Sequence, residues 1–206
     1  MKESKGNAKV DIKRQFQDGN TVVLHSVYDF DGQKMVAFDV FKFNKDGKIT
    51  EHWDNLTPER EANQSGHTQV DGVTKIDTKV NSKETKELVT NYIDDIIYGQ
   101  NPDKLDSYFD GDNYIQHNAD MVDTVSGFKK SLEMMSQMGI NMDYKKTYQV
   151  LAKGDFALVL SEGNLGGKNT AFYDLYRVKD GKIAEHWDVV ADIVDKANAK
   201  NTNGKF

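Results

Sequence analysis

The sequence has no cysteine, no long apolar run and no excess of positive charge, and each absence excludes a class of protein. Without cysteine, the 206-residue chain forms no disulfide, no thiolate zinc site and no cysteine nucleophile. No stretch approaches the ~20 apolar residues that span a bilayer. The formal net charge of −6 argues against nucleic acid or an anionic membrane as a partner.

The amino-terminal residues also lack the apolar core of a signal peptide. The cytoplasm is therefore the expected compartment, although a processed exported chain would look the same. A hydrophobic content of 37% and a mean hydropathy of −0.70 indicate a polar chain, with room for one large or two small domains.

What the sequence does contain is an internal repeat. A run rich in β-branched and aromatic residues, an Asp-Gly turn and a Glu-His-Trp-Asp sequence occur at 38–54 and again at 172–188. Each copy predicts a β-hairpin, and a repeat takes precedence over any single motif. Matching Gly19 with Gly154 gives an offset of 135 residues, which falls to 134 after the hairpin loop.

The loops of the two hairpins predict which residues face each other. The later hairpin is expected to close with a three-residue loop and the earlier one with a four-residue loop. Counting back from these loops places Asp174 opposite His186 and Asp39 opposite His52. Directly opposed residues have Cβ atoms ~5 Å apart on one face, so each hairpin is predicted to carry an Asp and a His side by side.

Helical patterns occur only around the second copy. Three helices are predicted between residues 81 and 138, after a polar, aperiodic stretch and before four further strands. The first copy is a four-stranded meander without helices. The chain is therefore divided into a partial repeat (1–56), a linker (57–80), a complete domain (81–195) and a polar tail (196–206).

The complete domain carries several short motifs in order. They are Tyr-Ile-Gln-His-Asn at 114–118, Gly-Phe at 127–128, and the hairpin from 174 to 188. Together they resemble the SnoaL-like polyketide cyclase family, in particular its predicted aldol-condensation branch. The resemblance covers 81–192 fully and 10–56 as a half copy. It implies the α+β cone shared with nuclear transport factor two and ketosteroid isomerase, in which a curved antiparallel sheet wraps on three helices around an apolar pocket.

The resemblance also implies roles for particular residues. In these cyclases an Asp before the Asp-Gly-Lys turn acts as acid/base on an enolisable carbonyl, assisted by a His earlier in the chain. These roles map to Asp174 and, as vestiges in the partial repeat, to Asp39 and His25. The chain departs from the pattern at Leu160, which stands where the complete domain would need that His, and at Ala119, where a Pro is usual. The complete domain is thus expected to lack one catalytic partner.

The residues themselves favour Asp174 as the centre of the chemistry. An Asp in the middle of an apolar strand is costly to bury unless it is paired, so it is either a general base in a pocket or a structural partner of His186 or Arg177. His186 either orients Asp174 or forms a structural pair with it. His117, with Asn118, is expected near the pocket mouth as an acid/base or substrate hydrogen-bond donor, the alternative being a capped strand end.

The expected ligand site continues from Asp174 onto neighbouring side chains. Alternation by two places Phe172 and Tyr176 on the same face of the strand as Asp174. Tyr92 and Ile96 lie on the apolar face of the first predicted helix and complete the expected lining.

Other side chains are expected on the opposite faces of the strands. Trp53 and Trp187 alternate with their His neighbours and are expected to be core or interface anchors on the other side of the sheet. For His25 two facings stay open. A two-residue turn at 31–32 places Leu24 opposite Asp39, whereas a three-residue loop places His25 there.

Two functions follow as hypotheses. The first is a cofactor-independent enzyme of the cyclase, isomerase or lyase type, which uses Asp174 to move a proton next to a carbonyl of a small apolar molecule. The second is a non-catalytic ligand-binding or dimerisation module. No metal is expected, because no spaced ligand set accompanies His117 and His186. The partial repeat is expected to pack on the sheet of the complete domain as an intrachain pseudo-dimer, with a homodimer as a further expectation.

Overall fold

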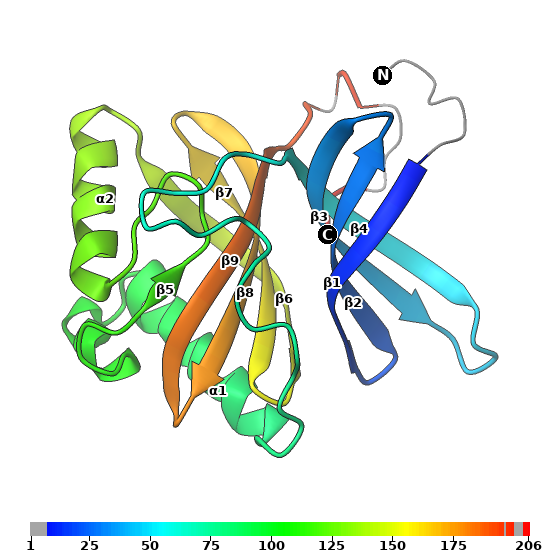
Figure 1. Ribbon diagram of the computed structural model, residues 1–206, viewed down its shortest axis with the longest axis horizontal. Coiled ribbons are helices and arrows are strands. Elements are labelled where there is room, and N and C mark those ends of the chain that lie inside the picture. The colour runs from blue at the N-terminus through cyan, green and yellow to red at the C-terminus, as the bar shows by residue number, and fades with distance from the viewer. Residues whose placement is uncertain (1–7, 196, 200–203) are drawn as a thin grey trace.

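The computed structural model describes residues 8–195, 197–199 and 204–206, which form two sheets and a group of helices (Figure 1). The first sheet has the order β1-β2-β3-β4, with bounds Ala8–Asp18, Thr21–Phe30, Gln33–Phe43 and Ile49–Pro58. The second has the order β5-β9-β8-β7-β6. Its strands are β5 (Ile115–Gln116), β6 (Met142–Lys153), β7 (Phe156–Leu165), β8 (Lys168–Lys179) and β9 (Lys182–Asp192).

The described helices lie between β4 and β6 in sequence, and β5 precedes the last of them. They are α1 (Ser82–Tyr92), a π-helical turn (Ile93–Ile97), a 3₁₀ helix (Pro102–Tyr108) and α2 (Val125–Gln137). The Asn81 side chain accepts a hydrogen bond from the Lys83 amide, and Thr124 accepts one from the Gly127 amide, so each α-helix begins at a polar cap. None of the helices in the described ranges is long and apolar enough to cross a membrane.

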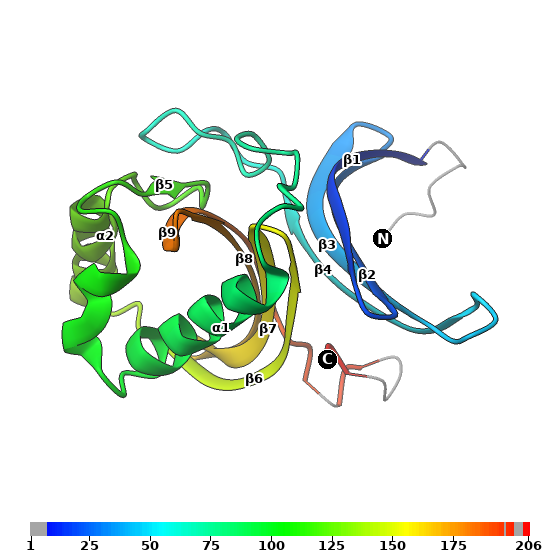
Figure 2. The same ribbon diagram turned by 90° about the horizontal axis from the view of Figure 1, so that it is seen from below.

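The complete domain is the α+β cone that the motifs predicted. Its sheet curves around α1, and the concave face packs against the helices (Figure 2). Helical apolar residues recur at three- and four-residue spacing, so they form one buried face. The core between helices and sheet includes Val89, Tyr92, Ile93, Phe109, Val159 and Tyr176.

The strands confirm the internal repeat. β2 and β7 have the same length and begin at Thr21 and Phe156, and β4 and β9 end at Pro58 and Asp192. These pairs reproduce the offsets of 135 before the hairpin loop and 134 after it that the sequence predicts. Helices α1 and α2 have no counterpart in the described part of the partial repeat.

The predicted pairing inside the two hairpins is wrong by two residues. Asp174 pairs with Asp188 and Tyr176 pairs with His186. The later turn contains only Asp180 and Gly181, both at positive φ, and a register shift follows between positions 177 and 178. A shift of two keeps every side chain on its face, so Asp174 and His186 are diagonal neighbours.

The earlier hairpin shows the same displacement. Asp39 pairs with Asp54, and Phe41 pairs with His52, after a register shift between positions 42 and 43. The repeat therefore preserves not only the residues but also their geometry on the strands.

The two sheets pack face to face within the chain, as expected for the partial repeat. Their shared core contains Phe16, Val23, Phe38 and Val40 from the first sheet, and Phe156, Leu158, Leu175 and Trp187 from the second. Strand β1 lies against its counterpart β6, and β4 lies against its counterpart β9. Such self-matching contacts are those of an approximate two-fold axis.

Polar contacts also join the sheets. Asn55 on β4 is fully buried, and its amide donates to the carbonyl oxygens of Ala171 and Val189 at 3.0 and 2.7 Å. Val189 occupies the position in β9 that Asn55 occupies in β4. One side chain at the approximate axis thus binds the backbone of the opposite sheet.

The open question of His25 is answered by the turn. Asp31 and Gly32 form a two-residue turn, Leu24 pairs with Asp39, and His25 pairs with Phe38. His25 therefore faces the core between the sheets, where its ring stacks on Phe38 at 4.3 Å. Burial, with the nearby Arg14 charge, holds the pKa of His25 well below its usual range. Trp187 lies fully buried in the same core, as predicted.

The connecting segment 59–81 runs beside both sheets and is tied to each of them. Asn63 donates to the carbonyl oxygen of Gln116 at 2.6 Å in the complete domain. From the partial repeat, buried Arg14 donates to the carbonyl oxygens of Val70 and Val73. The segment predicted as a linker thus supplies backbone acceptors for a buried charge.

Candidate active site

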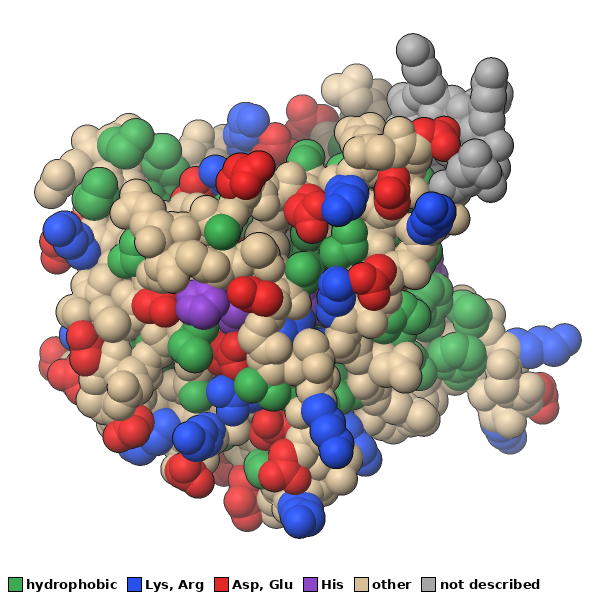
Figure 3. All heavy atoms as spheres, viewed as in Figure 1, with side chains coloured by type: hydrophobic (Ala, Val, Ile, Leu, Met, Phe, Trp, Pro, Cys, Tyr) green, Lys and Arg blue, Asp and Glu red, His purple; other side chains and the backbone are tan. Residues whose placement is uncertain are grey.

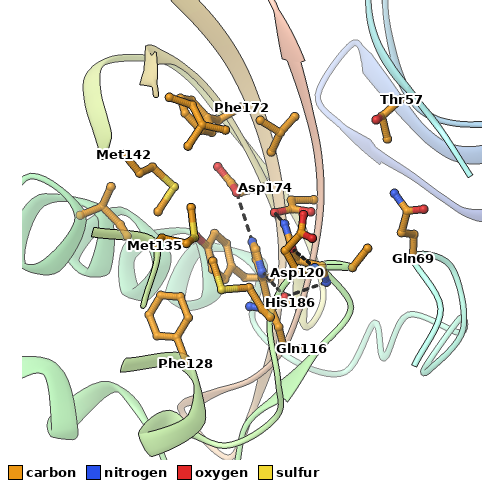
Figure 4. Close-up of a pocket in the computed structure, with 18 of the residues that line it drawn as sticks. Thr57, Gln69, Gln116, Asp120, Phe128, Met135, Met142, Phe172, Asp174 and His186 are labelled. Carbon is orange, nitrogen blue, oxygen red and sulfur yellow. Dashed lines mark hydrogen bonds and ion pairs between the residues drawn. The ribbon is translucent and has the colours of Figure 1, made fainter. Parts of the chain in front are cut away.

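A cavity of about 230 Å³ lies between the concave face of the second sheet and the helices (Figure 4). Its walls are mainly aromatic and thioether side chains, including Tyr92, Phe128, Met135, Met142, Phe172 and Tyr176. One end is polar. Asp174, His186, Asp188, Gln116 and Asn118 meet there.

Asp174 and His186 form the centre of the polar end. The Nε2 atom of His186 lies 3.2 Å from Oδ1 of Asp174, and both side chains are almost completely buried. The Tyr144 hydroxyl donates to the two carboxylate oxygens at 3.3 and 3.1 Å. Asp174 projects into the cavity beside Phe172 and Met142 (Figure 4).

The hydrogen bonds of Gln116 fix the proton on one nitrogen of His186. The Gln116 Oε1 atom accepts from the Asn118 amide at 3.1 Å, which identifies it as the oxygen. The same oxygen lies 2.9 Å from Nδ1 of His186. Because a carbonyl oxygen only accepts, Nδ1 must carry a proton.

This tautomer determines the state of the Asp174–His186 pair. A neutral ring with its proton on Nδ1 presents a lone pair at Nε2 to the Asp174 oxygen. The contact of 3.2 Å is then favourable only if a further proton lies between the two groups. The pair therefore holds one shared proton, as imidazolium with carboxylate or as imidazole with carboxylic acid.

Asp188 is the second carboxylate at this end of the cavity. Burial raises the pKa of Asp188 to about 6; His186 and a hydrogen bond from Asn118 oppose the rise, and the Asp174 charge adds to it. The Asn118 amide donates to Asp188 Oδ2 at 2.7 Å. Asp174, His186 and Asp188 offer ligand atoms within 4.8 Å of one another, but His186 uses both nitrogens for Gln116 and Asp174.

The tyrosines around the carboxylates remain phenols. Burial raises the pKa of Tyr114, Tyr144 and Tyr176 well above the usual value, and the charge of Asp174 raises it further in each. The pKa of Tyr92 is raised by the same two causes. The cavity is therefore surrounded by hydroxyl groups that can donate hydrogen bonds to an oxygen of a bound molecule.

Most residues predicted for the ligand site do line the cavity. Tyr92, Asn118, Phe172 and Tyr176 are all in its wall. Ile96 is not; it lies in a neighbouring hollow under α2 with Leu132 and Ile140, whereas Ile97 reaches the main cavity. In the π-helical turn the backbone geometry differs from that of an α-helix, so the side-chain positions are shifted from those that helical periodicity predicts.

The predicted place of His117 is wrong. Its ring is completely buried on the other side of β9, stacked on Trp187 at 4.6 Å. Its nitrogens face Glu185 and Asp71 and not the cavity. Asn118 follows it in sequence and points the opposite way, into the cavity, because neighbours in an extended chain alternate sides.

The sequence reasoning missed several contributors to the site, among them Gln116, Asp188, Tyr144 and Arg60. Asp188 had a signal, since it lies two residues after His186 in the repeated Glu-His-Trp-Asp sequence and shares its face. No sequence signal pointed to Tyr144, because this residue lies on β6 and reaches Asp174 on β8 across the intervening strand β7. Arg60 comes from the connecting segment and lines the cavity while it forms a bidentate pair with Asp120.

The partial repeat carries a second version of the central pair. The Nε2 atom of His52 lies 3.0 Å from Oδ1 of Asp39, and the Tyr28 hydroxyl donates to Oδ2 at 2.9 Å. His52 stacks on Phe41 and its side chain is 41% exposed. The Asp39 side chain is only 5% exposed, so within this pair the histidine is the open partner, on the outer face of its sheet.

The structure also shows where a histidine at position 160 would lie. Leu160 pairs with Tyr173 and lies in the core between the sheets, as does its counterpart His25. A histidine at 160 would face that core and not the cavity. The substitution therefore removes no group from the polar end of this cavity, contrary to the expectation of a lost catalytic partner.

The α+β cone is thus present in the strand order and in the helices on the concave face. No family model matches the sequence, and no curated protein matches it. Among solved structures, a proposed ketosteroid isomerase from Kribbella flavida DSM 17836 shows 13% identity and a TM-score of 0.46, over 60% of this chain and 93% of that one.

Two further solved structures are similar. IdmH, a proposed polyketide cyclase from Streptomyces antibioticus, has 15% identity and a TM-score of 0.39, covering 52% of this chain and 91% of that one. An LEH-like epoxide hydrolase from M. tuberculosis has 17% identity and a TM-score of 0.38, and the match covers 53% of this chain and 84% of that one. These similarities concern the fold alone and assign no reaction.

Proposed function

We propose that the protein is a cofactor-independent enzyme that transfers a proton next to a carbonyl group of a small molecule, with Asp174 as acid/base. The observation that carries this proposal is the 3.2 Å contact between Asp174 and His186 at the polar end of an aromatic cavity. A carboxylate beside a fixed proton source can both accept and return a proton.

The proposed step begins with the pair as imidazolium and carboxylate. The carboxylate of Asp174 takes the proton from the carbon next to the carbonyl, the electron pair of that C–H bond forms a carbon–carbon double bond, and the π pair of the carbonyl moves onto its oxygen. A tyrosine hydroxyl in the wall donates a hydrogen bond to the resulting enolate oxygen. Asp174 then returns the proton to a different carbon of a conjugated enolate, which completes an isomerisation. Alternatively, the enolate carbon attacks a second carbonyl of the same molecule, the new C–C bond closes a ring, and Asp174 gives its proton to the resulting alkoxide oxygen.

The lining points to a small and mostly apolar substrate. At about 230 Å³ the cavity is smaller than the ~300–1,000 Å³ typical of sites for drug-sized ligands. Its polar groups are concentrated at one end, so a substrate with one carbonyl end and an apolar body would fill it in a single orientation. Arg60 and Asp120 in the wall are the charged groups contributed by exposed residues.

A non-catalytic ligand-binding module is the alternative, and one observation favours it. The chain of contacts from Asp174 through His186 and Gln116 to the Asn118 amide is continuous. A fully satisfied network of this kind also occurs as a purely structural feature. Binding without proton transfer would then be the function.

One experiment separates the two functions. Small cyclic and aromatic ketones are incubated with the full chain in D₂O, deuterium uptake next to the carbonyl is followed by NMR, and binding is followed by the shift in melting temperature. We expect Asp174-dependent uptake for a subset of ketones. Ketones that raise the melting temperature without any deuterium uptake above the buffer rate would contradict the enzyme and support the binding module.

A further inference from the structure

A second group of titratable side chains lies on the side of β9 away from the cavity. It forms where the connecting segment crosses the complete domain, and Figure 3 shows histidine and acidic side chains together on that face. His67, Asp71 and His117 each offer one ligand atom, and these atoms lie within 4.8 Å of one another. The group is separate from the cavity described above, because none of the three residues lines it.

Both ring nitrogens of His117 are directed at oxygen atoms. Its Nε2 lies 2.9 Å from Oε1 of Glu185, whose other oxygen accepts from Arg177 at 2.7 Å. Its Nδ1 lies 2.7 Å from Oδ1 of Asp71 and 2.9 Å from the carbonyl oxygen of Thr68. A neutral ring that donates from Nε2 presents a lone pair to both oxygens, so a proton or a metal ion must lie beside Nδ1.

His67 repeats this arrangement. Its Nε2 lies 3.2 Å from a carboxylate oxygen of Asp123, and its Nδ1 lies 3.5 Å from Oδ2 of Asp71. The rings of His67 and His117 are 5.1 Å apart. Both histidines therefore direct Nε2 at one carboxylate and Nδ1 at the single carboxylate of Asp71.

We propose that His67 Nδ1, His117 Nδ1 and the Asp71 carboxylate bind a divalent transition-metal ion, with Zn²⁺ as the best match. Two imidazole nitrogens and one carboxylate oxygen are a common ligand set for such ions. Metal-bound histidines almost always donate the other N–H to a carboxylate or carbonyl, which is the role of Glu185 and Asp123 here. The ion supplies the positive charge that the lone pairs require.

The spacing needs a small adjustment on one side only. Two ligands of a tetrahedral zinc ion at ~2.0–2.1 Å are roughly 3.3 Å apart, whereas Nδ1 of His117 and Oδ1 of Asp71 are 2.7 Å apart. The Asp71 side chain is 43% exposed and can withdraw, while His117 is fixed by burial. The carbonyl oxygen of Thr68 or a water completes the coordination.

The position of the site indicates a structural role. Asp71 also accepts through its backbone oxygen from the Trp187 indole at 2.9 Å and from Arg14. Arg14 comes from the partial repeat, and its guanidinium lies 4.0 Å from the ring of Trp187. An ion at Asp71 would therefore hold the connecting segment to the complete domain at the point where that segment binds the partial repeat.

This site could not be predicted from the sequence, because His117 lies far along the chain from His67 and Asp71. Asp71 and His117 are 46 residues apart, and His67 lies in a segment without helical or strand periodicity. Only the fold brings them together, so spacing rules for metal motifs do not apply.

The test uses the full chain after treatment with a chelator. Zn²⁺ is titrated calorimetrically, bound metal is measured by elemental analysis, and the melting temperature is recorded with and without the ion. We expect one ion per chain and a higher melting temperature when it is bound, because an ion that binds only the folded state stabilises it. Co²⁺ in place of Zn²⁺ should show the visible absorption of a tetrahedral site.

Matched variants identify the ligands. His67→Gln and Asp71→Asn change partly exposed side chains and should weaken binding by at least 100-fold. Asp123→Asn should weaken it by about 10–100-fold, the usual cost of losing an outer-shell partner. His52→Gln is the control, since His52 belongs to another His and Asp group in the partial repeat, and it should leave binding unchanged. No bound ion, or binding lost with His52→Gln but retained with His67→Gln, overturns the proposal.

Discussion

The chain presents the same Asp-His-Asp arrangement twice, in two different surroundings. Asp174, His186 and Asp188 recur as Asp39, His52 and Asp54 at the repeat offset, and in both copies the His nitrogen lies about 3 Å from the first Asp. In both, a tyrosine hydroxyl donates to that Asp. The two copies differ in how far the histidine side chain is shielded from solvent. The His186 side chain is 9% exposed, and that of His52 is 41% exposed.

The comparison shows that the strands supply the polar groups, whereas the helices enclose those groups in a cavity. Both sheets carry the pair because both hairpins have the same displaced register. Only the complete domain has α1, the π-helical turn and α2 on the concave face, and these elements exclude water and supply Tyr92 and Phe128 to the cavity. A low-dielectric surrounding strengthens every interaction of a charged group. Substitutions made in matched pairs, one in each copy, measure that contribution.

The largest difference is expected for the two central carboxylates. Asp174→Asn keeps the shape and hydrogen bonding of the side chain but cannot accept a proton, so deuterium uptake by a ketone substrate should fall by ~10²–10⁴, the usual contribution of a general base. Asp39→Asn should leave the rate within a factor of two. NMR exchange rates of the two purified variants check this. Full activity of Asp174→Asn would remove Asp174 from the mechanism.

The next largest effect is expected for the tryptophans of the core between the sheets. Trp187 is fully buried under Arg14 and stacks on His117. Trp187→Ala should lower the free energy of unfolding by ~3–5 kcal/mol, as for other buried aromatic residues. Trp53 packs on the same core but is only partly buried, so Trp53→Ala should cost about half as much. Urea unfolding curves give both values, and equal losses would show that the two halves of the interface are equally packed.

The second carboxylates of the two groups, Asp188 and Asp54, should differ in how their replacement changes the free energy of unfolding with pH. Burial raises the pKa of Asp188 to about 6, above its unfolded value of 3.8, so the folded state favours the protonated form. The cost of burying the charge is absent below pH 4, grows as the pH rises from about 4 to 6, and is complete above that range. Asp188→Asn should therefore raise the free energy of unfolding at pH 8 by up to ~3 kcal/mol.

The same substitution in the partial repeat is the control. The Asp54 side chain is 47% exposed, so Asp54→Asn should change the free energy of unfolding little at any pH. For Asp188→Asn the gain should vanish at pH 4, where both forms of the site are neutral. Unfolding curves at pH 4, 6 and 8 test both statements. A gain independent of pH would mean that the effect of Asp188→Asn comes from packing and not from charge.

Local patterns predicted most of the fold and about half of the site. The cap at Asn81 and the alternation in β8 are local signals, and so the elements and the face of Phe172, Asp174 and Tyr176 could be predicted. The exact pairing could not, because a one-residue change in the turn and a register shift each moved it. The place of His117 depended on the direction in which a two-residue strand presents its side chains to β9.

The smallest difference is expected for the tyrosines that donate to the two central carboxylates. Tyr144 is enclosed, and its hydroxyl bonds both oxygens of Asp174 in the cavity. Tyr144→Phe leaves those oxygens without that donor and should lower the free energy of unfolding by ~1.5–2 kcal/mol, as for hydrogen bonds to charged groups. Tyr28 makes the shorter bond, 2.9 Å to Asp39, but lies at the edge of an open sheet face where water can replace it, so Tyr28→Phe should cost ~0.5 kcal/mol or less. Urea unfolding at pH 7 compares the two. If bond length decided the outcome, Tyr28→Phe would cost more, and the role assigned to the helices in strengthening the site would be wrong.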